Sequence, residues 1–131
     1  MTDKSLILKS FNNHFFEFLQ DIITIFPENE ELQFTKAKME MLKKANPVCI
    51  IKAWYFFVFE KYNNIIFSGD ITFFFDKDYK QDLEYLKNPS EIMNIIDKLR
   101  EPIRNMSDIN KEHTLKYMQN LCKLSDIYMR V

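Results

Sequence analysis

Histidine and cysteine are the side chains most often used for nucleophilic catalysis and for zinc binding, and this chain has two of each. They are His14, Cys49, His113 and Cys122. A nucleophilic cysteine needs a base positioned beside it. His113 and Cys122 are nine residues apart, which places them on opposite sides of a helix that turns 100° per residue. The spacing therefore predicts structural histidines and buried free thiols, and it does not predict a catalytic pair.

Metal and phosphate sites are also disfavoured by spacing. Neither a His-x-x-x-His nor a Cys-x-x-Cys pattern occurs, so zinc has no ligand set of the usual kind. The acidic run that begins at Asp76 has Gln81 where a calcium loop needs glycine and Lys87 where it needs glutamate. One glycine, Gly69, cannot build a glycine-rich phosphate loop. We expect no catalytic residues, no metal and no cofactor, and we predict that the protein is not an enzyme.

Lysines provide the one local charge asymmetry. Residues 36–61 carry six lysines against two glutamates, a net charge of +4, although the whole chain has a net charge of only −1. Four of these lysines fall on the second expected helix: Lys36, Lys38, Lys43 and Lys44. Such a basic face can contact the phosphates of a nucleic acid. The alternative is a solvated helix in which Lys36, Glu40 and Lys44 form ion pairs four residues apart.

Apolar residues at spacings of three and four predict the helices that would position these groups. The first helix starts after Asp3, and Pro27 ends it. The second reaches about Ala45, with its apolar face formed by Leu32, Met39 and Leu42.

Asn46 and Pro47 then open a segment in which residues 48–59 are apolar at every position except Lys52. An all-apolar helix is a buried one, and twelve residues are too few to cross a membrane. We therefore expect a central core helix and no membrane span.

Residues 63–76 read equally well as a small hairpin or as two short helical turns, because runs of β-branched and aromatic residues this short carry no clear period. Further helices are expected from Asp78, from Asn88 with a kink at Pro102, and from Ser107 or Asp108 onward. The fold class is predicted to be all-α, in one domain spanning 1–131. We expect a compact orthogonal bundle of about six helices around a central apolar helix at 47–61. The alternative is α+β, with the hairpin at 63–76.

Aromatic residues are in surplus, with 13 Phe, 6 Tyr and one Trp. They fit a dry aromatic core, and they also fit apolar surface left for a protein partner or for self-association. The two cysteines lack the spacing of a disulfide framework, and charged residues interrupt the N-terminal segment. We therefore expect an intracellular protein that is not secreted.

Several short segments occur in a characteristic order along most of the chain. They are residues 9–15, 26–28, 44–47, 51–54, 74–79, 99–103 and 117–121. This order resembles a family of short proteins encoded by giant nucleocytoplasmic large DNA viruses of protists. The resemblance implies a virus-encoded protein located in the host cytoplasm, the viral factory or the virion. It also implies helices through 63–76, and it implies no particular activity.

Taken together, these features favour a non-enzymatic interaction or structural protein with a protein partner or with self-association. The alternative function is nucleic-acid binding through Lys36, Lys38, Lys43 and Lys44. An enzyme whose site uses tyrosine, lysine or carboxylates in an unfamiliar arrangement stays open as a third hypothesis.

Overall fold

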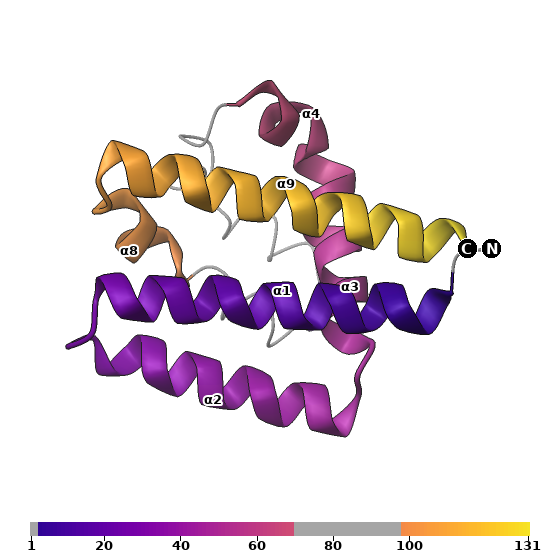
Figure 1. Cartoon of the computed structure of the whole chain (residues 1–131), viewed down its shortest axis with the longest axis horizontal. Helices are drawn as coiled ribbons and strands as arrows, with labels where there is room; N and C mark the ends of the chain where they lie inside the picture. The colour runs from indigo at the N-terminus through magenta and orange to yellow at the C-terminus, as the bar shows by residue number, and fades with distance from the viewer. Residues whose placement is uncertain (1–2, 70–97) are drawn as a thin grey trace, which may run out of the picture.

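The computed structural model describes residues 3–69 and 98–131 (Figure 1). Within these ranges every regular element is a helix, so the predicted all-α class is confirmed and the α+β alternative is not supported. Residues 63–68, the first part of the predicted hairpin, lie in helix α4 (Glu60–Ser68). The rest of that segment, and the helices predicted from Asp78 and Asn88, lie outside the described residues.

Polar side chains just before the first two helices cap their N-termini. In α1 (Lys4–Ile25), the Asp3 carboxylate accepts the Ser5 amide at 2.9 Å, which satisfies one of the free amides of the first turn. In α2 (Glu30–Ala45), the Asn29 side chain accepts the Leu32 amide at 3.2 Å. Both predicted helices are confirmed, and Glu30 and Glu31 lie at the positive end of α2.

The central helix is longer than predicted. It runs through α3 (Cys49–Trp54), a π-helical turn η1 (Tyr55–Phe59) and α4, without a break between them. In the π-turn the Glu60 amide donates to the Tyr55 carbonyl, five residues earlier. The helix ends at Gly69, whose φ of 91° is the left-handed conformation that favours glycine. The sequence around Gly69 is therefore a helix end, and it is not the turn of a hairpin.

The start of the central helix also differs from the prediction. Asn46 and Pro47 form a turn, in which the Asn46 side chain accepts the Val48 amide at 3.3 Å. The α-helix itself begins two residues later, at Cys49. Asn46 therefore closes the turn that separates α2 from the central helix, and its side chain does not cap the helix that follows.

The C-terminal part contains a short helix, α8 (Arg100–Arg104), and the long α9 (Asp108–Arg130). Ser107 caps α9 by accepting the Asn110 amide at 3.2 Å, as predicted. Pro102 lies inside α8, and the part of the predicted kinked helix before residue 98 is not among the described residues.

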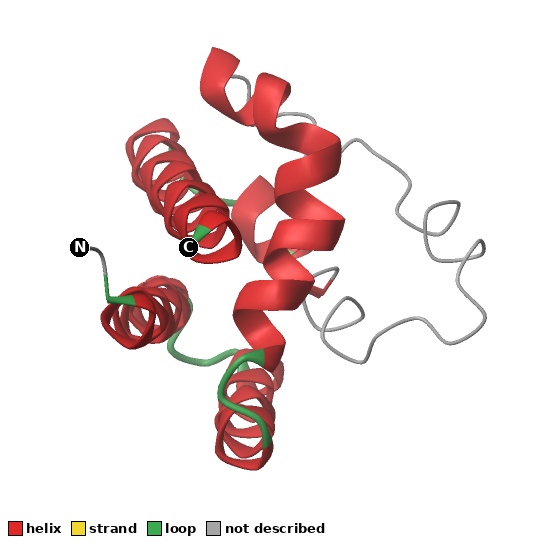
Figure 2. Cartoon of the chain, turned by 90° about the vertical axis from the view of Figure 1, so that its right-hand side faces the viewer, coloured by secondary structure: helices red, strands yellow, loops and turns green. Residues whose placement is uncertain are grey.

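The helices α1, α2 and α9 lie side by side, with α1 in the middle (Figure 1). The central helix crosses them at a steep angle, which Figure 2 shows with those three helices seen nearly end-on. Trp54 lies at this crossing and is 1% exposed. Its ring packs edge-on against Phe11 and Phe15 of α1, and its Nε1–H donates to Cys122 Sγ of α9 at 3.3 Å. The predicted aromatic core therefore centres on this helix.

Candidate functional site

The outer face of α2 carries large apolar side chains that no other element within residues 3–69 and 98–131 covers. The inner face packs onto α1 and α3 and buries Leu32, Thr35 and Met39. On the opposite face Phe34 and Met41 are 65% and 71% exposed. Exposed alanines extend this face, and we call the set the α2 stripe: Phe34, Ala37, Met41 and Ala45. At 100° per residue, Phe34, Met41 and Ala45 fall within about 40° of one another around the helix.

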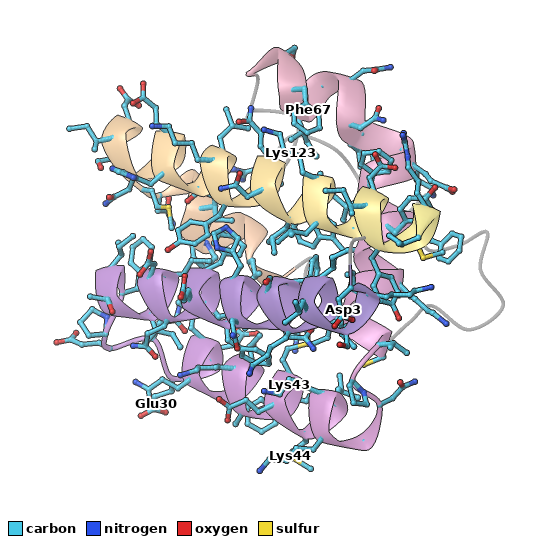
Figure 3. The ribbon with its side chains drawn as sticks, turned by 45° about the vertical axis from the view of Figure 1, so that its right-hand side comes forward. Asp3, Glu30, Lys43, Lys44, Phe67 and Lys123 are labelled. Carbon is cyan, nitrogen blue, oxygen red and sulfur yellow. The ribbon has the colours of Figure 1, made fainter. Side chains whose placement is uncertain are left out.

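Opposite charges mark the two ends of the α2 stripe. Glu30 lies in the first turn of α2 and Lys44 in the last. Figure 3 shows both side chains at the outer edge of the helix, pointing away from α1. Neither forms an ion pair within the described part of the chain, whereas the neighbouring Glu31 pairs with Lys98 at 3.8 Å. Glu30 and Lys44 are therefore available to groups on another molecule.

The four lysines of the predicted basic face do not gather in one place. Lys36 donates to the Gln20 side chain of α1 at 2.8 Å, in place of the expected pair with Glu40. Lys38 is half-buried and makes contacts of its own. Lys43 and Lys44 lie at the end of α2, and the Lys43 ammonium is 4.9 Å from the centre of the Phe16 ring. Only these last two lysines line a common groove.

That groove, the basic groove, lies between the N-terminal half of α1 and the C-terminal end of α2 and measures about 460 Å³. Its cations are Lys9, Lys43 and Lys44, and none of the described residues that line it is a carboxylate. Asn12, 7% exposed, holds its wall by donating from Nδ2 to the Pro47 carbonyl at 3.1 Å. Lys9 was not predicted to belong to the basic surface, because it lies near Lys43 and Lys44 only when α1 and α2 pack antiparallel. Lys9 could have been predicted to join Lys43 and Lys44 if the first two expected helices had been paired antiparallel.

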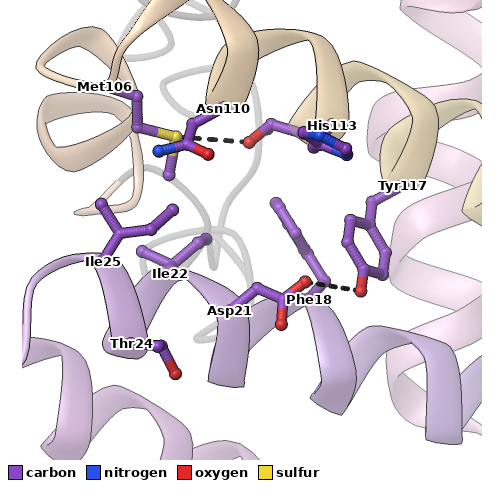
Figure 4. Close-up of a pocket in the computed structure, with 10 residues that line it drawn as sticks. Phe18, Asp21, Ile22, Thr24, Ile25, Met106, Asn110, His113 and Tyr117 are labelled. Atoms are coloured by element: carbon purple, nitrogen blue, oxygen red, sulfur yellow. Dashed lines mark hydrogen bonds between the residues drawn. The ribbon is translucent and has the colours of Figure 1, made fainter.

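A second hollow, the α1–α9 cleft, opens between the C-terminal half of α1 and the start of α9 (Figure 4). It measures about 300 Å³, with an apolar floor that includes Phe18 and Ile22 and a polar rim that includes Asp21, His113 and Tyr117. The Tyr117 hydroxyl donates to Asp21 Oδ2 at 2.6 Å. This arrangement suits hydrogen bonding to a small polar molecule.

The electrostatics of the cleft keep Tyr117 neutral. The hydrogen bond to Asp21 raises the pKa of Tyr117 to about 12, and burial and the charges of Asp21 and Glu17 act in the same direction. The ring of His14 lies against the Tyr117 ring, with 4.6 Å between their centres. At neutral pH Tyr117 is therefore a hydrogen-bond donor, and its phenolate is too scarce to act as a base.

Both cysteines are free thiols, but the prediction that both are buried is right only for Cys122, because Cys49 is partly exposed. Burial raises the pKa of Cys122 to about 12, and burial also raises the pKa of Cys49. Because the thiolate is the reactive form, both thiols are poor nucleophiles at neutral pH. His14 has Glu17 as its charged neighbour, at 3.7 Å from Nδ1, and no hydrogen bond joins either histidine to a thiol or hydroxyl in the described residues.

Two further features are absent from residues 3–69 and 98–131. No group of three or more potential metal ligands is found in them. Over the same residues, no helix has the length and apolar character that a membrane span requires. Comparisons with protein-family models, with curated proteins and with solved structures give no match to this chain.

Proposed function

We propose that this is a non-enzymatic interaction protein that binds another protein chain through the α2 stripe. The observation that carries the proposal is the exposure of Phe34 and Met41 on the outer face of a helix whose inner face is already buried. Aromatic residues and methionine are enriched in protein–protein interfaces relative to the rest of the surface. A partner is expected to cover this face in the functional state.

Phe34 and Met41 can supply a substantial part of the binding free energy. Burying one large apolar side chain is worth about 1.5–3 kcal/mol. Two such anchors near the centre of an interface resemble the few residues that supply most of the affinity in measured complexes. Charged residues at both ends of the stripe, Glu30 and Lys44, would add selection of partner and orientation.

The chemistry of the remaining groups supports a non-enzymatic role. The raised pKa values of Cys122 and Tyr117 disfavour the ionised forms that nucleophilic or base catalysis requires. The likeness of residues 9–15 and 44–47 to proteins of giant DNA viruses of protists supports a viral origin. We infer from it a site of action in the host cytoplasm, the viral factory or the virion.

Site-specific photocrosslinking tests the proposal. A photoreactive residue is introduced at Met41, and in a matched control at Lys116, which is exposed on α9. In cells that produce the protein, position 41 should give a discrete crosslinked protein adduct and position 116 should not. Adding Phe34→Asp should abolish the adduct, because a charge then replaces the neighbouring apolar anchor. The absence of any adduct specific to position 41 would contradict the proposal.

Nucleic-acid binding is the second candidate function, and the basic groove is the observation that favours it. Lys9, Lys43 and Lys44 line one groove, and no carboxylate is among its described lining residues. Three phosphate contacts predict that the logarithm of the binding constant falls with the logarithm of salt concentration with a slope of about −2 to −3.

Fluorescence anisotropy with labelled RNA and DNA at low salt measures this binding. Lys9→Glu combined with Lys43→Glu should abolish it, whereas the control Lys116→Glu with Lys123→Glu, on exposed positions of α9, should leave it unchanged. If neither nucleic acid binds at low salt, or if both double variants bind equally, the groove has no such role.

A further inference from the structure

We infer that the occupant of the α2 stripe is the α2 stripe of a second copy of this chain, packed antiparallel about a two-fold axis. The inference rests on the proposed function, because it names the partner of the same surface. It comes from the arrangement of apolar and charged residues along α2, which is matched about the centre of the helix.

The midpoint of the two anchors and the midpoint of the two end charges are half a residue apart, which is less than 1 Å along the helix. Phe34 and Met41 lie at equal distances from the point between Ala37 and Lys38, and Glu30 and Lys44 lie at equal distances from Ala37. A two-fold interface requires this property, because a residue that contacts a second residue across the axis must be contacted in return. Both the pairing of Phe34 with Met41 and the pairing of Glu30 with Lys44 therefore place the two-fold axis at the central residues of α2.

In this register Phe34 meets Met41 of the partner subunit, and Met41 meets Phe34 of the partner subunit. Ala37 lies beside the axis, where its small side chain allows the helices to approach at the usual distance of about 8–10 Å. All three residues are exposed in the single chain. The packing therefore places a large side chain next to a large one and leaves the small Ala37 beside the axis.

Charge selects the antiparallel direction over the parallel one. Glu30 and Lys44 lie on the same flank of the α2 stripe, at about 40° and 80° from Phe34 around the helix. In an antiparallel pair each flank faces the same flank of the partner, so Glu30 meets Lys44 of the partner subunit twice. In a parallel pair Glu30 lies about 21 Å along the helix axes from Lys44 of the partner subunit, so neither contact forms. Both residues are exposed and have no ion pair within the described part of their own chain.

The decisive experiment mixes two charge-reversed proteins and measures association by sedimentation velocity over a range of concentrations. Glu30→Lys and Lys44→Glu each create two like-charged contacts in their own dimer, so each variant alone should dimerise about tenfold more weakly than the native chain. In an equimolar mixture both contacts regain opposite charges, and heterodimers should form with close to native affinity. The control pair Glu112→Lys and Lys116→Glu, exposed on α9, should show no such difference.

Recovery in the mixture separates a lost contact from a lost fold, because a misfolded variant has no intact stripe to offer its partner. A native chain that stays monomeric at all concentrations, or a mixture no tighter than its components, would overturn the inference. If position 41 nevertheless crosslinks to a different protein, the proposed function stands and the second copy is the wrong partner. If position 41 gives no adduct, both are wrong.

Discussion

The hydrogen bond between Tyr117 and Asp21 gives the α1–α9 cleft its electrostatic character. It raises the pKa of Tyr117 from 10.0 to about 12 because the carboxylate accepts from the neutral phenol and repels the phenolate. A raised folded-state pKa contributes stability that is fully present below pH 10 and is lost as the pH rises towards 12. The contact between these two residues was not predicted from the sequence, because 96 positions separate them.

We predict that Asp21→Asn lowers the pKa of Tyr117 towards 10, because the amide carries no charge to repel the phenolate. Absorbance of tyrosinate near 295 nm measures this titration. The contribution of Tyr117 among the six tyrosines is obtained by subtracting the curve of Tyr117→Phe in the same background. A native Tyr117 that already titrates near 10 would contradict the assignment.

Short-range signals within single helices were sufficient to predict most of the helix ends. Asp3, Asn29 and Ser107 each accept an amide of the first turn, and sequence alone had predicted the helices that they begin. Residues 65–67 were ambiguous because their types favour a strand. Tertiary packing decides the outcome: Ile66 is fully buried, and Gln119 of α9 donates to its carbonyl at 3.0 Å.

The end of the central helix gives a prediction at this scale. Gly69→Ala should reduce the free energy of unfolding by about 1–2 kcal/mol, because a Cβ is disfavoured in the left-handed conformation even though no atom lies near enough to clash. Gly69→Asn should cost less, since asparagine tolerates this conformation. Urea denaturation measures both, with Asn64→Ala on exposed α4 as the control. Equal stabilities of the alanine and asparagine variants would argue against a left-handed helix end.

For the molecule as a whole, the candidate surfaces depend on packing that sequence does not display. The apolar face predicted for α2 is correct, because Leu32 and Met39 are buried and Leu42 is partly buried. Phe34 and Met41 form a second face, which no other described element covers. This follows only from the placement of α2 among the described helices, with α1 and α3 on its inner side. The basic groove likewise exists only where Lys9 meets the end of α2.

The central claim is that the α2 stripe binds a second copy of the chain in antiparallel orientation. The most direct test is the distance between nitroxide labels attached at Ala45→Cys, measured by pulsed electron paramagnetic resonance. The background is Cys49→Ser, and Cys122 is buried and expected not to react. Antiparallel pairing predicts labels separated by about 22 Å along the helix axes, at 1.5 Å per residue. A separation near 10 Å would indicate parallel pairing, and the absence of dipolar coupling at high protein concentration would contradict the claim altogether.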